Sequence, residues 1–374
     1  MHSAALPSPD ARALAASRAL LERIGAELAR AGNWISFARY IELALHEPGL
    51  GYYAGGARKF GAGGDFVTAP ELTPLYGRAL AGQIRELLQP GEAVLEFGAG
   101  SGALAAAILE ELAVPYFVLE TSAELKQRQQ QRLGGSVQWL DRLPQHFRGV
   151  MIANEVVDAM PVHAVAWTDA GIRERGVCAN EGELAWSDRA ADGLVLSESK
   201  KIRVEIPPSG RYESELALFA RLWMRSLGRL LERGALLVVD YGFPAREYFH
   251  PQRSMGTLAC HYRHRVHGDP FFLPGLQDIT AHVDFSALAQ AATDAGLEVL
   301  GYASQMQFLV NCGITDLLER ENPEDAKRYL PAAAAVQKLL MPAEMGELFK
   351  VLAVGRGVKG VLKGFREGDR SGAL

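Results

Sequence analysis

A carboxylate followed by three glycines is the clearest chemical signal in the sequence. The run Glu96-Phe-Gly98-Ala99-Gly100-Ser-Gly102 follows an apolar segment predicted as a strand and precedes a predicted helix. Glycines allow a tight turn from strand to helix and let a ligand lie against the backbone, while the helix N-terminus supplies N–H donors. The run therefore predicts a nucleotide-like cofactor site.

A second acidic residue follows the next predicted strand. Glu120, with Thr121 directly after it, lies where a carboxylate can accept hydrogen bonds from both hydroxyls of a ribose. Because Ala103 also completes the dinucleotide pattern G-x-G-x-x-G/A, these residues alone are compatible with NAD or with S-adenosylmethionine.

Three features favour S-adenosylmethionine. Glu96, just before the first glycine, is typical of methyltransferases, where it helps to organise the loop around the amino-acid end of the cofactor. The run from Asn154 to Pro161 follows the fourth predicted strand, where such enzymes present side chains to the methyl acceptor, and it contains no His or Lys for a dehydrogenase. A single glycine loop occurs, and the predicted sheet closes with an antiparallel strand near Val354.

Short apolar runs that alternate with helical patterns predict βα units and a parallel sheet from residue 92 onward. An antiparallel insertion is expected at 160–208, followed by an amphipathic helix over Glu213–Glu232. We therefore expect an α/β fold: a Rossmann-like sheet of about seven strands with helices on both faces. The core strands are predicted at Val94–Phe97, Tyr116–Glu120, Val137–Leu140, Val150–Asn154, Leu236–Asp240, Val299–Ala303 and Leu348–Val354, and those of the insertion at Val162–Trp167, Ile172–Cys178 and Val204–Ile206.

The same patterns divide the chain into six segments. Two helices precede the core, and the spacing of Thr68 and Glu71 predicts a capping box at the start of a third. The expected segments are an N-terminal helical extension with a glycine-rich loop (1–69), the cofactor-binding half of the core (70–160), the β insertion (161–208), the second half of the core (209–304), a helical cap (305–345) and the last strand with a tail (346–374).

Composition excludes several classes of protein. With 374 residues, 48% hydrophobic and 22% charged, the chain can bury a large core. A net charge of −5 gives no general attraction to nucleic acid, and no apolar stretch approaches the roughly 20 residues that span a bilayer. Three separated cysteines indicate a reducing compartment. Arg263 and Arg265 argue against a metal site in the His-rich run 260–267, and we expect no metal.

Five motifs in one order resemble the MidA-like family of class I methyltransferases, over about residues 34–355. The family's mitochondrial members are protein arginine methyltransferases that assist assembly of respiratory complex I. The resemblance implies a class I methyltransferase sheet, S-adenosylmethionine as cofactor, and an arginine of a protein, by this likeness a respiratory-chain subunit, as acceptor. The motifs are Gly64-Asp65-Phe-Val-Thr68-Ala-Pro-Glu71, Glu96 to Gly102, Asn154-Glu155-Val-Val-Asp158-Ala-Met-Pro161, Asp240-Tyr-Gly242 and Ile279-Thr-Ala-His282-Val-Asp-Phe285.

An arginine acceptor sets demands that acidic residues can meet. A guanidinium carries five N–H donors and stays charged, so carboxylates must bind it and turn one nitrogen toward the methyl group. Our hypothesis makes Glu155 the guanidinium clamp, Asp158 its second acidic partner, and Asn154 an orienting carbonyl that also borders the cofactor.

The resemblance also gives His282 a role in acceptor binding or proton removal. The loop that contains Asp65 and Thr68 is predicted to fold over the cofactor, with Asp65 near its amino group. Asp284 precedes a predicted helix and is expected to serve as its N-cap.

Other functions remain open from the sequence. A small-molecule methyltransferase would need an enclosed apolar pocket under the 305–345 segment, and an assembly factor would bind the cofactor without turnover. A NAD-dependent dehydrogenase is a more distant alternative. We expect a cytoplasmic protein of the bacterial branch, in contrast to the mitochondrial matrix of the eukaryotic relatives, and a homodimer is left open.

Overall fold

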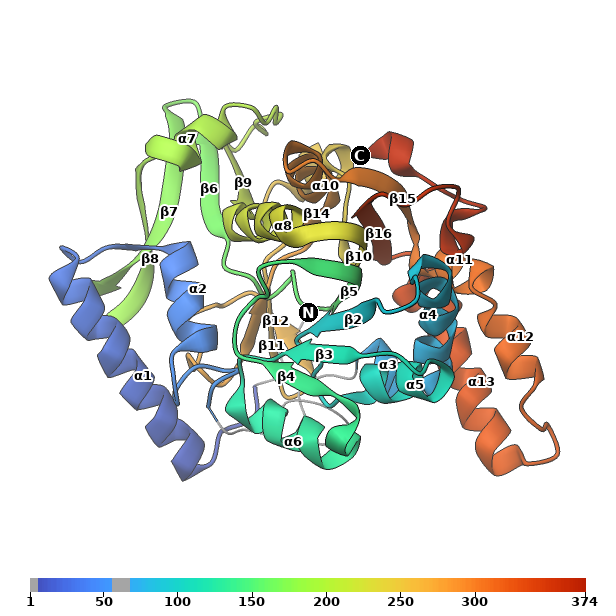
Figure 1. Cartoon of the computed structure of the whole chain (residues 1–374). Coiled ribbons are helices and arrows are strands. Elements are labelled where there is room, and N and C mark those ends of the chain that lie inside the picture. The colour runs from blue at the N-terminus through green and yellow to red at the C-terminus, as the bar shows by residue number, and fades with distance from the viewer. Residues whose placement is uncertain (1–5, 56–67) are drawn as a thin grey trace. The chain divides into compact units, whose positions relative to one another are not determined.

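The computed structural model describes residues 6–55 and 68–374 (Figure 1). The chain divides into two compact units, each built from three stretches of sequence. The first unit takes Met1–Phe66, Asp158–Ala220 and Ala245–His282, and the second takes Val67–Val157, Arg221–Pro244 and Val283–Leu374. The chain therefore passes between the units after residues 66, 157, 220, 244 and 282.

The second unit is built on a mixed sheet with the strand order β4-β3-β2-β5-β10-β16-β15. The strands from β4 to β10 run parallel, whereas β16 is antiparallel to both of its neighbours. The predicted Rossmann-like sheet of seven strands, closed by an antiparallel strand, is confirmed. Its strands are β2 (Ala93–Phe97), β3 (Tyr116–Leu119), β4 (Gln138–Leu140), β5 (Phe147–Asn154), β10 (Leu231–Phe243), β15 (Glu298–Ser304) and β16 (Phe349–Arg356).

The strand β10 is longer than its apolar run predicts. It continues through Asp240 and Tyr241 to Phe243, and its end pairs in parallel with β14 (Val283–Asp284). Asp284 then caps α10 (Phe285–Asp294) by accepting a hydrogen bond from the Ala287 N–H at 3.0 Å, which confirms its predicted role as an N-cap.

Helices of the second unit pack on this sheet through small and apolar residues. Gly77 on α4 approaches α5 so closely that a Cβ there would lie 2.6 Å from the Cβ of Ala107. Residues 305–345 contain the helices α11, α12 and α13, and Pro331 lies inside α13. The helices are α3 (Ala69–Leu72), α4 (Pro74–Leu87), α5 (Ala103–Glu111), α6 (Ala123–Leu133), α11 (Gln305–Asn311), α12 (Ile314–Glu319) and α13 (Ala326–Leu340), with short turns at Gly134–Ser136, Pro342–Gly346, Lys363–Phe365 and Ser371–Ala373.

The predicted capping box at Thr68 and Glu71 is wrong. Thr68 makes no side-chain cap, and the helix breaks at Thr73, whose backbone is extended because Pro74 follows it. The Thr73 hydroxyl accepts a hydrogen bond from the Leu75 N–H at 3.3 Å and caps α4 instead. The carboxylate of Glu71 instead accepts a hydrogen bond from the hydroxyl of Ser101.

The first unit contains two antiparallel sheets and the N-terminal helices. One sheet has the order β1-β7-β6-β9, with β8 also paired to β7, and the other has the order β12-β11-β13. The elements are α1 (Ala11–Arg30), β1 (Ile35–Ser36), α2 (Phe37–His46), β6 (His163–Thr168), β7 (Gly171–Asn180), β8 (Glu183–Ala190), α7 (Gly193–Ser199), β9 (Arg211–Leu216), α9 (Ala245–Tyr248), a short turn at Pro251–Arg253, β11 (Ala259–Tyr262), β12 (Arg265–His267) and β13 (Asp278–Thr280).

Two predictions for this region are wrong. Val204–Ile206 is not a strand, since Pro207 and Pro208 directly follow it and cannot donate to a ladder. The insertion also contains β8, which was not predicted and pairs with β7, and its last strand is β9, which pairs with β6 from Arg211 to Leu216. The helix predicted over Glu213–Glu232 therefore begins only at Leu218, as α8 (Leu218–Leu230).

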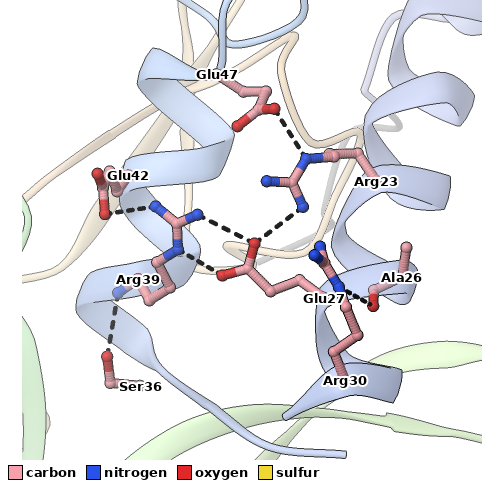
Figure 2. A network of polar contacts seen from close by, with 8 residues as sticks. All are labelled: Arg23, Ala26, Glu27, Arg30, Ser36, Arg39, Glu42 and Glu47. Atoms are coloured by element: carbon pink, nitrogen blue, oxygen red, sulfur yellow. Dashed lines mark hydrogen bonds and ion pairs between the residues drawn. The ribbon is translucent and has the colours of Figure 1, made fainter.

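An ion-pair network joins α1 to α2 within the first unit (Figure 2). Glu27 accepts hydrogen bonds from Arg23 at 2.9 Å and from two nitrogens of Arg39 at 2.5 and 3.0 Å. Arg23 also binds Glu47, and Arg39 also binds Glu42, so the charges alternate in sign along the network. The hydrogen bonds from Arg39, followed by those from Arg23, hold the pKa of Glu27 below its usual value.

Replacing Glu27 with alanine should lower the Tm by about 1–2 °C, the shift expected for roughly 1 kcal/mol in a chain of 374 residues. Because the pKa of Glu27 is depressed, its contribution is present above the unfolded pKa and is lost as pH falls through the folded one. Thermal scans at neutral and acid pH test this, with Glu22→Ala on the exposed side of α1 as control. An equal loss at both pH values would contradict it.

Candidate functional site

The glycine loop joins β2 to α5 and has an unusual backbone. Gly98, Gly100 and Gly102 all have positive φ angles, of 58°, 55° and 79°. A Cβ at residue 98 would approach Val156 to 3.3 Å, and one at residue 102 would approach Leu133 to 3.1 Å. Only glycine adopts such conformations at three alternate positions without strain. The backbone of the loop therefore carries no side chains at these positions, beside the N-terminus of α5.

Glu96 is buried in β2, two residues before the loop. Its carboxylate accepts a hydrogen bond at 2.6 Å from the hydroxyl of Tyr116 on the neighbouring strand. The pKa of Glu96 is raised to about 7, mainly by burial. The hydrogen bond from Tyr116 opposes this rise, and the nearby charge of Glu120 adds to it. A carboxylate that titrates near neutrality at this place can either accept or donate a hydrogen bond.

Glu120 follows β3 and is held by donors on both of its oxygens. The Ser122 N–H donates to Oε1 at 2.8 Å, and the side-chain amide of Gln129 donates to Oε2 at 2.9 Å. Thr121, between Glu120 and the N-cap Ser122, is exposed. The carboxylate thus keeps a fixed orientation at the carboxyl end of β3, the same edge of the sheet as the glycine loop.

Glu71 reaches the glycine loop from α3. It accepts a hydrogen bond from the hydroxyl of Ser101, and Arg132 on α6 donates to that hydroxyl at 2.6 Å and to the Ser101 carbonyl at 3.2 Å. Arg132 also lies 3.7 Å from Glu71, so three segments of the second unit meet at this loop.

A polar network occupies the end of β5. Asn154 accepts a hydrogen bond from the Tyr76 hydroxyl at 2.5 Å and donates to Glu155 Oε1 at 3.2 Å. The same oxygen accepts from the Ala69 N–H at 3.2 Å. Glu155 itself has a φ of 53°, in the left-handed region that non-glycine residues rarely adopt. Its backbone strain marks this turn as a functional candidate.

The neighbouring strand supports this turn. Asp240 in β10 is buried, and its carboxylate accepts hydrogen bonds from the Val157 N–H at 3.0 Å and from the Tyr241 N–H at 2.9 Å. The Glu155 N–H donates to the Val239 carbonyl at 2.9 Å. The conformation of residues 154–157 is therefore fixed by β10.

The other predicted site residues fall elsewhere. Asp158 and His282 belong to the first unit, where the carbonyl of Asp158 accepts from the Ala281 N–H at 3.0 Å and the His282 N–H donates to the Thr257 hydroxyl at 3.0 Å. Ala99 and Thr68 lie in the second unit, and Asp65 lies outside the described residues. Of the residues predicted to act on the methyl acceptor, Asn154 and Glu155 thus belong to the second unit, and Asp158 and His282 belong to the first.

Sequence reasoning missed the partners that orient these groups. Gln129 and Tyr76 are buried polar residues at helical spacing among apolar ones, and Tyr116 begins a strand, so each resembles an ordinary core position in the sequence. Among the described residues, no group of three His, Cys, Asp or Glu side chains could hold a metal ion. Nor is any helix within 6–55 and 68–374 long and apolar enough to cross a membrane.

The residues present fit an adenosyl cofactor. Glu120 offers an oriented carboxylate for a ribose, the positive-φ glycines offer bare backbone, and Glu96 adds a second acid at the same strand ends. Asn154 lies at the end of β5, the strand paired with β2, and is the last of the residues that fit this cofactor.

Comparisons with known proteins identify the family and its cofactor. Residues 75–303, more than half of the chain, match the model of a family described as "Putative S-adenosyl-L-methionine-dependent methyltransferase". A crystal structure from Burkholderia thailandensis, described as a "likely methyl transferase" bound to S-adenosyl-homocysteine, is 48% identical with a TM-score of 0.94 and covers 99% of this chain and 100% of its own.

Two curated relatives are more distant. "Protein arginine methyltransferase NDUFAF7, mitochondrial" from Danio rerio is 29% identical and covers 90% of this chain and 87% of its own length. The Homo sapiens protein of the same name is 27% identical and covers 86% and 80%.

The sheet order and the glycine loop define a class I methyltransferase fold. The chain belongs to the S-adenosylmethionine-dependent methyltransferase family whose model spans its core, and S-adenosylmethionine is the cofactor of that family.

Proposed function

We propose that this protein transfers a methyl group to the side chain of an arginine in another protein. The observation that carries the proposal is the carboxylate of Glu155, which lies at the end of β5 on a strained backbone and accepts hydrogen bonds from Asn154 and the Ala69 N–H. The names of the distant relatives, protein arginine methyltransferases, support the same acceptor.

The chemistry assigns a task to each group. S-adenosylmethionine, when bound, supplies an electrophilic methyl group on a sulfonium sulfur. Glu155 binds the acceptor guanidinium through charge-assisted hydrogen bonds, and Asn154, itself fixed by Tyr76, keeps that carboxylate in place. Alignment of acceptor and methyl group, with water excluded, is the main work of such an enzyme.

Asp158 and His282 remain candidates for contact with the acceptor, and Asp65 and Thr68 for contact with the cofactor. By the family resemblance, the acceptor is a respiratory-chain subunit.

A labelling experiment tests the acceptor class. A cell extract is divided into a dialysed protein fraction and a small-molecule ultrafiltrate. The purified protein and S-adenosylmethionine with a labelled methyl group are added to each fraction in parallel incubations. We expect label in protein and methylarginine after acid hydrolysis. Label only in the ultrafiltrate would contradict the proposal and indicate a small-molecule acceptor. Intact cofactor binding with no label in either fraction would contradict it too, and would favour an assembly factor.

A further inference from the structure

Gln129 is a buried amide in an otherwise apolar row of α6. The buried residues of this helix are Leu125, Gln129 and Leu133, at the spacing of one helix face. Burying an amide costs about 1–3 kcal/mol unless hydrogen bonds compensate, so a polar residue at this position calls for an explanation.

The amide of Gln129 connects two parts of the cofactor site. Its nitrogen donates to the carbonyl of Gly100 in the glycine loop at 3.0 Å and to Oε2 of Glu120 at 2.9 Å. One side chain from α6 thereby touches both the loop after β2 and the acid after β3. The spacing between these two groups depends on the position of a single amide.

Trp139 on β4 fixes which way that amide points. Its indole Nε1, which can only donate, makes a 2.9 Å hydrogen bond to the oxygen of Gln129. The Gln129 oxygen must therefore face Trp139, and both N–H groups must face Gly100 and Glu120. With the Ser122 N–H on its other oxygen, the Glu120 carboxylate has a donor on each side.

We propose that Gln129, oriented by Trp139, is a positioning residue for cofactor recognition: it holds the Glu120 carboxylate and the Gly100 carbonyl so that the site selects an adenosyl ligand with both ribose hydroxyls. Gln129 acts through Glu120 and the glycine loop, and it makes the site pre-organised. The inference depends on the cofactor site and not on the identity of the methyl acceptor.

Binding of two ligands tests the proposal by calorimetry. The ligands are S-adenosylhomocysteine and its 2′-deoxyribose analogue. The unmodified protein should prefer the ribose form by about tenfold or more, the effect of one hydrogen bond to a charged group. Gln129→Met should lose most of that preference, because S-adenosylhomocysteine weakens about tenfold while the deoxy analogue weakens little. Trp139→Phe, which keeps an aromatic ring but removes the orienting donor, should show a smaller loss in the same direction.

Controls separate positioning from packing. Gln130→Met, at an exposed position of the same helix, should leave both affinities unchanged, and Glu120→Gln should lose the preference as Gln129→Met does. Equal weakening of both ligands by Gln129→Met would overturn the proposal, since it would show a structural role only. So would an unchanged preference in Glu120→Gln. If Gln129→Met does not fold, Trp139→Phe carries the test, and an unchanged preference in that variant overturns the proposal.

Discussion

Valine in place of Gly100 should remove binding of S-adenosylhomocysteine while the protein still folds. Gly100 has a φ of 55°, which a β-branched residue does not tolerate, and its carbonyl is held by Gln129. The loop must therefore move, or the new side chain must enter the space beside the backbone where we expect the cofactor to bind. We expect calorimetry to show an affinity reduced by at least about 100-fold, equivalent to roughly 2.7 kcal/mol.

A second glycine of the same unit provides a matched control. Gly134 has a φ of 54°, almost the same as Gly100, and a Cβ there would meet nothing within 4 Å. Its ψ of −133° lies in a region that only glycine adopts readily, so Gly134→Val introduces backbone strain of its own, and this control tests whether strain alone removes binding. If both variants bind S-adenosylhomocysteine like the unmodified protein, the glycine loop is not the cofactor site.

Glutamine in place of Glu155 should reduce methyl transfer by roughly 100-fold, in the range seen when one oriented charged or polar group is lost from an active site. The substitution keeps an oxygen that can accept from the Ala69 N–H, so the turn after β5 should survive. It removes the negative charge that the guanidinium requires. Binding of S-adenosylhomocysteine should stay unchanged, and the rate of label transfer to the protein fraction should fall.

The matched control for this variant is Glu324→Gln, an exposed glutamate in the same unit. It should transfer label at the rate of the unmodified protein. Full transfer by Glu155→Gln, with cofactor binding intact, would show that another residue binds the acceptor.

The core of the fold could be predicted because its signals are local. The apolar run of β2, the glycines after it and Glu120 after β3 each define their position within a few residues. The errors arise where pairing partners are distant in the sequence. Residues 213–216 fit an amphipathic helix equally well, and only their pairing with β6 makes them a strand.

The site was predicted less completely than the fold for a related reason. A carboxylate at a strand end is visible in the sequence, but the donors that orient it come from other elements. Tyr76 reaches Asn154 from α4, and Gln129 reaches Glu120 from α6. Neither residue differs in type or spacing from an ordinary helix residue.

The position of β16 has a consequence for how the chain is made. This strand comes after every other strand in the described chain, yet it pairs on one side with β10 and on the other with β15. Until residues 349–356 leave the ribosome, β10 and β15 each present an unpaired apolar edge of the kind that promotes aggregation. The sheet can close only after residues 349–356 have been made, so truncation or slow translation before Phe349 should expose a nascent chain that depends on chaperones.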